Sequence, residues 1–192
     1  MQKSAKEVIR KEALARRRGL SEAYRRQASE AIMNRLCEET VWQKAGTVFL
    51  YYGYKDEVQT EGLISRALSE GKRVYLPRVI SDDEMVFIRI HSLYGMESGA
   101  FGIKEPPYRA GDKESVSEAD RPDMIIVPCV AVSRGGNRIG HGRGYYDRYL
   151  SLMGDVPLVC LAFDCQLADE FEAESTDIRM KTIITEHEII RT

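Results

Sequence analysis

Short apolar runs that do not alternate strictly with polar residues limit this chain to a small set of folds. Each run is rich in β-branched or aromatic residues and is bounded by glycine, proline, aspartate or charged residues, as strands are. Several of them are apolar without a break, which is typical of parallel strands buried on both faces. The runs span Val48–Tyr52, Val74–Leu76, Met85–Ile90, Met124–Val132 and Leu158–Phe163.

A helical segment lies between the first two of these runs. Thr60–Ser69 places four apolar residues at helical spacing, and Gly71 stands where the helix should end. Strand, helix and strand in this order indicate a βαβ unit, which belongs to a parallel sheet. We therefore expect an α/β fold, a three-layer α/β/α sandwich with a mainly parallel, Rossmann-like open sheet.

Two further helices are expected before the first strand. One spans Ala5–Arg18 and ends at Gly19, and Ser21 is placed as the N-cap of a second helix that reaches about Glu39. A chain of 192 residues has the length of one α/β domain. We expect a single domain over residues 1–192, with residues 1–40 as a helical pair packed on it.

The positive charge of the chain is concentrated near its N-terminus. The first 36 residues hold ten Lys or Arg against four Asp or Glu, although the whole chain has a net charge of −2. This balance excludes a generally basic nucleic-acid coat and indicates a local anion site. Lys6 and Arg10 lie four apart on the first expected helix, where like charges repel unless an anion relieves them. A solvated basic face is the alternative.

Targeting and redox signals are weak in this sequence. No stretch reaches the roughly 18 apolar residues that a membrane helix needs, and charged residues stand where a signal peptide would be apolar. We therefore expect a cytoplasmic protein with no membrane partner. Cys37, Cys129, Cys160 and Cys165 form no C-x-x-C pair and lie in or beside apolar runs. They predict reduced, mostly buried thiols rather than a zinc site or disulfides.

The segment Met124–Leu150 carries the most informative chemical pattern. Its apolar run leads into a loop with glycines at 135, 136, 140, 142 and 144, and a helix is expected to begin near Tyr145. Such glycines let backbone N–H groups converge, and a helix start adds free donors, so the loop is predicted to bind phosphate. Arg138, His141 and Arg143 can add charge-assisted hydrogen bonds. The pattern is neither the dinucleotide G-x-G-x-x-G nor the Walker motif; a flexible surface turn is the alternative.

Two carboxylates stand beside these elements. Asp147 falls in the first turn of the expected helix, where an acid either complements the helix dipole or, beside a phosphate loop, holds Mg2+. Glu57 follows the first strand and precedes the helix capped by Thr60. It is either an exposed loop carboxylate or a ligand-binding group, because ligands bind at the carboxyl ends of strands in open α/β sheets.

Taken together, these motifs resemble the 5-formyltetrahydrofolate cyclo-ligase family, also called methenyltetrahydrofolate synthetase. The resemblance covers nearly the whole chain, and the last of its four motifs is highly specific. The motifs are Lys6-x-x-x-Arg10, Asp56-Glu57-Val58-x-Thr60, Gly102-Ile103-x-Glu105-Pro106 and Arg138-Ile139-Gly140-x-Gly142-x-Gly144-Tyr145-Tyr146-Asp147.

The resemblance implies an ATP-dependent cyclisation of 5-formyltetrahydrofolate to 5,10-methenyltetrahydrofolate, with ADP and phosphate as products and Mg2+ as the metal. On the family mechanism the formyl oxygen attacks the γ-phosphate, and N10 then closes on the activated carbon. Cations and aligned N–H donors, rather than a protein nucleophile, meet the charge of the transferring phosphoryl group. The implied partners are ATP and a reduced folate, with no nucleic acid, and the implied state is a monomer.

The resemblance also assigns roles to individual residues. Asp147 is implied to hold Mg2+, and Tyr52, Glu57 and Phe101 to bind the folate, with Glu57 accepting hydrogen bonds from the pterin. Arg138, Arg143 and Tyr145 are the implied catalytic residues. The implied ATP-binding residues are Lys6, Arg10, Arg138, Ile139, Gly140, His141, Gly142, Arg143, Gly144, Tyr145 and Tyr146.

Two positions depart from the family pattern. Val132-Ser133 stands where many relatives have Phe-Asp, and Lys181 aligns with a second metal-associated Asp of some relatives. A lysine cannot ligate Mg2+ because its ammonium has no free lone pair. Its ammonium either contacts a phosphate or the folate glutamate, or points to solvent; we favour the second, because Mg2+ retains several waters and one carboxylate can suffice. These departures leave open a catalytically weak or inactive member that binds nucleotide or folate as a sensor or carrier. An RNA-binding module is disfavoured because a basic-aromatic surface pattern is missing from the sequence.

Overall fold

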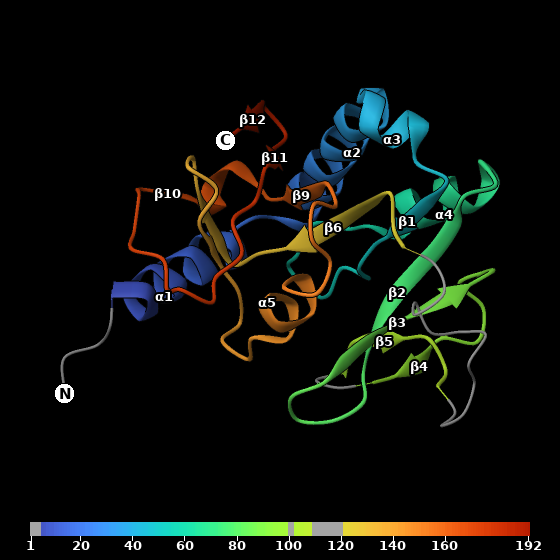
Figure 1. Cartoon of the computed structure of the whole chain (residues 1–192). Helices are drawn as coiled ribbons and strands as arrows, with labels where there is room; N and C mark the ends of the chain where they lie inside the picture. The colour runs from blue at the N-terminus through green and yellow to red at the C-terminus, as the bar shows by residue number, and fades with distance from the viewer. Residues whose placement is uncertain (1–4, 100–101, 109–120) are drawn as a thin grey trace.

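The structure, a computed structural model, describes residues 5–99, 102–108 and 121–192 (Figure 1). Within these residues the central five strands of the main sheet run parallel, and its two edge strands, β12 and β3, are antiparallel to their neighbours. The mainly parallel, Rossmann-like open sheet is thus confirmed. Its spatial order is β12 (Ile189–Arg191), β11 (Thr182–Ile184), β9 (Leu158–Leu161), β6 (Met124–Pro128), β1 (Thr47–Phe49), β2 (Arg73–Val79) and β3 (Met85–Ile90).

Helices cover both faces of this sheet. Neighbouring residues of one strand pack on opposite sides: Val48 belongs to the core beneath α2 (Glu22–Glu38), α3 (Thr40–Lys44) and α4 (Glu61–Ser69). Phe49 belongs to the core beneath α5 (Tyr145–Leu150). Both side chains are fully buried. The three-layer α/β/α sandwich is confirmed, and burial on both faces explains why the strands do not alternate in polarity.

The N-terminal helices agree closely with the sequence prediction. α1 spans Ala5–Arg18, and α2 begins after Ser21, whose hydroxyl accepts a hydrogen bond from the backbone N–H of Tyr24 at 3.2 Å. α1 packs against β7 (Ala131–Ser133) and the 3-10 helix η2 (Asp164–Gln166), whereas α2 packs on the main sheet and α4. The two helices therefore contact different parts of the domain (Figure 1).

The expected strand Met124–Val132 is wrong as a single strand. β6 ends at Pro128, and β7 then pairs with β8 (Arg138–Ile139) and β10 (Leu167–Ala168) in a separate three-stranded sheet. The Pro128 and Cys129 carbonyl oxygens accept hydrogen bonds from distant side chains, which hold the chain at this bend. After the bend, Val132 packs in the same apolar cluster as Val127 of β6, and Val130 packs in another beneath α1. The sequence therefore stays apolar through the break.

A short hairpin extends the fold beside β2. β4 (Glu97–Ser98) and β5 (Lys104–Glu105) form a two-stranded antiparallel sheet. Arg78 of β2 forms ion pairs with Glu97 at 3.2 Å and with the buried Glu105 at 3.4 Å. These ion pairs fasten the hairpin to the main sheet.

The cysteine side chains have the character that the sequence predicts. All four cysteines are free; Cys37, Cys129 and Cys160 are buried and Cys165 is partly buried, as expected. None of the helices in the described ranges has the length and apolar character needed to cross a membrane.

Candidate functional site

Three segments meet at the carboxyl ends of the central parallel strands: the turn after β1, the glycine loop between β8 and α5, and helix α1. His141 Nε2 of the glycine loop lies 3.3 Å from Glu57 Oε1 of the turn. Arg10 Nε of α1 donates to the carbonyl oxygen of Gly140 at 2.9 Å. The structure thus brings together the segments that the sequence predicts for the site, at the edge where open α/β sheets bind ligands.

Local hydrogen bonds hold the turn that carries Glu57. Glu57 Oε2 accepts from the backbone N–H of Tyr54 at 3.1 Å. The Thr60 hydroxyl donates to the carbonyl of Tyr51 at 2.5 Å and accepts from the backbone N–H of Gly53 at 2.9 Å. A Cβ at Gly53 would lie 2.2 Å from a backbone oxygen, so only glycine fits there. Glu57 is only 13% exposed, and its carboxylate has a fixed direction toward the glycine loop.

Arg17 fastens this turn to α1 and to the end of β6, and the sequence analysis missed it. Its guanidinium donates to both carboxylate oxygens of Asp56, at 3.0 and 3.3 Å, and to the carbonyl of Cys129 at 3.2 Å. Burial alone would raise the pKa of the Asp56 carboxyl, but Arg17 outweighs it and holds that pKa below its usual value. The sequence does contain one sign of this role: Arg17 follows Arg10 by seven residues, so both lie on the same face of the helix.

Lys6 and Arg10 have different partners. Arg10 lies along the glycine loop, whereas the ammonium of Lys6 donates to Glu174 at 2.9 Å and to Asp177 at 2.5 Å. Burial lowers the pKa of Lys6, but these hydrogen bonds outweigh it and raise that pKa above the usual value. Lys6 thus remains cationic, but of the two residues it is Arg10 that contacts the glycine loop.

Arg138, in the strand that leads into the glycine loop, is part of an ion pair. Its Nη2 donates to Asp147 Oδ1 at 2.8 Å, and its Nη1 donates to the carbonyl of Pro128 at 3.3 Å. The Arg138 side chain is 3% exposed and that of Asp147 is 25% exposed. The structure brings these two predicted site residues together, and they bind each other.

At the two ends of this loop, two buried polar atoms have no hydrogen-bond partner among the described residues: Arg138 Nε and the Tyr146 hydroxyl. The Arg138 guanidinium carbon lies 5.8 Å from the centre of the Tyr146 ring. Burial, and then the Glu57 carboxylate, raise the pKa of the Tyr146 hydroxyl. This hydroxyl therefore stays protonated and can donate a hydrogen bond to a ligand.

The backbone of the loop depends on glycine at two positions. Gly142 has a φ of +93° and Gly144 a φ of +69°, in the left-handed region that strains other residues. The expected helix start is confirmed, because α5 begins at Tyr145 and runs for six residues. The change from left-handed backbone to helix turns the chain sharply beside Arg10 and Glu57.

The remaining predicted site residues are spread around this centre. The Tyr145 hydroxyl donates to the carbonyl of Ser81 at 3.2 Å, and the ring of Tyr52 lies 5.4 Å from Lys104 Nζ. Ile139 is buried in an apolar cluster beneath α1, and Arg143 is exposed. Phe101 lies outside the described residues.

Metal ligands are sparse. In the described part of the chain, no group of three His, Cys, Asp or Glu side chains could hold a metal ion. Asp147 is a single carboxylate already paired with Arg138. This donor set fits only an ion such as Mg2+ that is coordinated mostly by phosphate oxygens and water.

The two departures from the family pattern have other partners than this carboxylate. Lys181 precedes β11, at the amino ends of the strands, and its 62% exposed side chain lies 3.6 Å from exposed Asp155. The expectation that Lys181 points to solvent is confirmed. Ser133 is buried and donates to Glu170 at 2.9 Å, which anchors the turn between β7 and β8.

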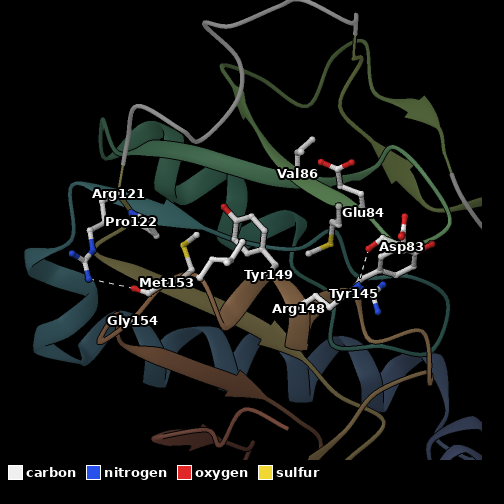
Figure 2. Close-up of a pocket in the computed structure, with 12 residues that line it drawn as sticks. Asp83, Glu84, Val86, Arg121, Pro122, Tyr145, Arg148, Tyr149, Met153 and Gly154 are labelled. Atoms are coloured by element: carbon white, nitrogen blue, oxygen red, sulfur yellow. Dashed lines mark hydrogen bonds between the residues drawn. The ribbon is translucent and has the colours of Figure 1, made fainter. Parts of the chain in front are cut away.

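A groove of about 550 Å³ opens beside the glycine loop, between α5 and the hairpin that joins β2 to β3. Figure 2 shows Tyr145 near one end of this groove and Arg121 near the other. Tyr145 belongs to both the predicted site and the groove, so the two are adjacent. The other lining residues are Asp83, Glu84, Met85, Val86, Pro122, Arg148, Tyr149, Leu152, Met153 and Gly154.

Comparisons with known proteins show what this chain is similar to. The model of the 5-formyltetrahydrofolate cyclo-ligase family matches residues 2–186. The 5-formyltetrahydrofolate cyclo-ligase of Escherichia coli K12 is 30% identical over 174 residues, covering 88% of this chain and 94% of its own. The solution structure of Aquifex aeolicus 5,10-methenyltetrahydrofolate synthetase is 32% identical, with a TM-score of 0.84 over 98% of this chain and 93% of its own. The structure of a 5,10-methenyltetrahydrofolate synthetase from Mycoplasma pneumoniae is 26% identical, with a TM-score of 0.75 over 95% of this chain and 99% of its own.

Proposed function

Because this chain belongs to the 5-formyltetrahydrofolate cyclo-ligase family, we propose that it converts 5-formyltetrahydrofolate and ATP to 5,10-methenyltetrahydrofolate, ADP and phosphate in one-carbon metabolism. The observation that carries this proposal is the 3.3 Å contact between His141 and Glu57. It joins a carboxylate suited to pterin N–H groups to a loop suited to phosphate. The reaction needs this adjacency, since the formyl group of the folate must meet the γ-phosphate of ATP.

The proposed chemistry has two steps. The formyl oxygen attacks the γ-phosphorus, and ADP leaves. N10 then adds to the activated formyl carbon and loses its proton, and phosphate leaves with the former formyl oxygen. The protein stabilises the negative charge on the transferring phosphoryl group, because fixed cations and N–H donors act strongly in a water-poor site.

On the phosphate side, Lys6, Arg10 and the loop from Arg138 to Tyr146 would bind ATP. Arg10 already lies against this loop, and Lys6 would exchange one carboxylate partner for a phosphate oxygen. Arg143 and Tyr145 are the proposed contacts to the transferring phosphoryl group. The buried guanidinium of Arg138 would act by keeping the loop in shape through its bond to Asp147.

On the pterin side, Glu57 would accept hydrogen bonds from the N–H groups of the ring, with Tyr52 and Phe101 beside it. The contact between Glu57 and His141 would open as the pterin binds, which frees the imidazole for the phosphate. The bound folate would take the place of His141 beside Glu57, and the bound nucleotide would take the place of Glu57 beside His141.

Mg2+ would be held by Asp147 together with the phosphates of ATP, where it neutralises phosphate charge. The ion pair with Arg138 gives the Asp147 carboxylate a fixed direction. A monomeric enzyme in the cytoplasm, with no nucleic-acid or membrane partner, belongs to the same proposal and rests on the charge distribution and the family resemblance.

The test is a direct assay of the purified protein with 5-formyltetrahydrofolate and MgATP. We expect methenyl absorbance and phosphate to appear together, and each to require both substrates. Tight binding of folate and ATP without turnover would instead make the chain a sensor or carrier, and binding of neither would refute the proposed site.

The Glu57→Gln variant tests the pterin subsite. The glutamine keeps the size of the side chain but replaces one acceptor with a donor, which leaves a buried contact unpaired. We expect the KM for folate to rise about tenfold or more, with a much smaller change in the KM for ATP. Equal changes in both constants would make Glu57 a general structural residue.

A further inference from the structure

The contact between His141 and Glu57 occupies one group from each of the two proposed subsites. The Glu57 carboxylate can only accept hydrogen bonds, so the proton of this contact is on His141 Nε2. The other carboxylate oxygen accepts from the backbone N–H of Tyr54 at 3.1 Å. Because the Glu57 side chain is only 13% exposed, a ligand N–H group that approaches from the glycine loop meets an oxygen that is already bonded. The protein thus places its own donor where the pterin is proposed to donate.

The His141 side chain can move while the glycine loop stays in place. This side chain is 59% exposed, so few neighbours hold it. The loop backbone is held at other points, by the bond from Arg10 to the carbonyl of Gly140 at 2.9 Å and by the Arg138–Asp147 pair at 2.8 Å. A change of side-chain rotamer at His141 therefore breaks the contact with Glu57 and leaves the loop fixed.

We propose that this contact is a latch that couples the binding of the two substrates, with the His141 side chain as its moving part. In the closed state His141 is bonded to Glu57. In the open state the imidazole points to the phosphate position, and the carboxylate can accept from the pterin. This inference rests on the proposed function and adds positive cooperativity to it. Folate and nucleotide both bind the open state, so the first to bind opens the latch and the second binds a site that is already open.

The strength of the coupling follows from the exposure of the contact. A bond at a largely exposed side chain contributes little to stability, because water screens it and the side chain loses freedom. We therefore expect each substrate to raise the affinity of the other about threefold to fivefold. The two factors must be equal, since the coupling free energy between two binding sites is reciprocal.

The test is calorimetric binding of 5-formyltetrahydrofolate to the wild-type protein, with and without the Mg2+ complex of an ATP analogue whose β–γ bridge is a methylene group. This analogue cannot transfer its terminal phosphoryl group, so binding is measured without turnover. We expect folate to bind about threefold to fivefold more tightly when the analogue is present. The affinity for the analogue should rise by the same factor when folate is present.

The His141→Ala variant distinguishes a latch from a structural contact. It removes the donor that occupies Glu57, so it should bind folate alone about threefold to fivefold more tightly than the wild type does. Its affinity for folate should no longer depend on the analogue. A residue that only supports the site would have the opposite effect, because its loss weakens binding.

Two further variants serve as controls. His141→Gln keeps an N–H donor near the position of Nε2, so it should keep the coupling. His91→Ala makes the same change as His141→Ala at an exposed histidine that directly follows β3. It should match the wild type in the affinity for each ligand, alone and in the presence of the other.

The outcomes separate the latch from the proposed function. Weaker folate binding by His141→Ala, or coupling in this variant equal to that of the wild type, would overturn the latch. Independent binding of the two ligands by a wild-type protein that turns over folate and ATP would overturn the latch and leave the proposed function intact. A wild-type protein that binds neither ligand would refute both.

Discussion

Two buried arginines hold the two halves of the site, and they differ in how far each reaches along the chain. Arg138 of β8 joins Asp147 of α5, nine residues away across the glycine loop, whereas Arg17 joins Asp56, 39 residues away in another segment. Both arginine side chains are 3% exposed, and they donate to the successive carbonyls of Pro128 and Cys129. A buried arginine–aspartate pair therefore shapes the glycine loop in one case, and in the other it sets the distance between α1 and the turn that carries Glu57.

Loss of the shorter pair should have the largest effect. Arg138→Ala leaves Asp147 and the Pro128 carbonyl without their cation, so we expect the free energy of unfolding to fall by about 3 kcal/mol. Turnover should fall about 100-fold because the phosphate loop loses its shape. Urea denaturation and steady-state kinetics measure these effects. A variant with wild-type stability and turnover would mean that the ion pair does not shape the loop.

Weakening of the Arg17–Asp56 pair should affect the KM for folate more than the KM for ATP. Arg17→Lys keeps the charge but loses the two-pronged contact with Asp56, so the turn that carries Glu57 should shift. We expect the KM for folate to rise about tenfold and the KM for ATP to change less than about twofold.

Arg16→Lys is the control for this experiment. Arg16 precedes Arg17 on α1, and its guanidinium donates to the carbonyl of Cys165 at 2.8 Å on the surface. Its kinetic constants should match the wild type. A parallel rise of both KM values in Arg17→Lys would mean that the longer pair supports the whole fold rather than the spacing of the subsites.

The acidic partner of the shorter pair tests the proposed metal role. Asp147→Asn keeps a hydrogen-bond acceptor for Arg138 but removes the negative charge, so the Mg2+ concentration for half-maximal turnover should rise about fivefold. Lys181→Ala should change it little, because Lys181 lies beside Asp155 at the opposite ends of the strands. A large effect in Lys181→Ala alone would move the cation site away from the glycine loop.

The smallest expected effect is on the pH dependence of stability. Arg17 keeps the pKa of Asp56 lower in the folded protein than in the unfolded chain. The resulting stabilisation is fully present above the unfolded value of about 4 and is lost as the pH falls through the lower, folded value. Asp56→Asn should therefore cost about 1 kcal/mol at pH 7 and less at pH 3. Urea midpoints at both pH values measure it, and a constant difference would contradict the prediction.

The comparison also explains which parts of the structure could be predicted. The apolar runs predict the sheet and its layers, because a parallel strand between helices must be apolar on both faces. Ser21 and Gly144 mark helix starts through local backbone chemistry. The bend after Pro128 escapes this reasoning, since Val127 before it and Val130 after it are both apolar and buried.

Side-chain pairing across the chain was harder to predict. A single sequence gives no sign that Arg17 meets Asp56, because only the tertiary fold brings the two segments together. Arg138 and its partner Asp147 both belong to the site predicted from the sequence. Their predicted roles, binding phosphate and binding Mg2+, do not include a bond between the two side chains. Burial decides this case: a 3% exposed guanidinium needs a carboxylate close by.

The contacts of α1 have a consequence for the order in which this protein is made. Its side chains bind Cys129, Gly140, Cys165 and Asp177, which are 112 to 171 residues farther along the chain. Contacts between such distant residues form late in folding, because a long loop must close first. On the ribosome this basic helix is therefore made well before these four partners, and of its buried contacts only that of Arg17 with Asp56 involves a segment made early. The packing of α1 is complete only after the segment around Asp177 has been synthesised and contacts Lys6.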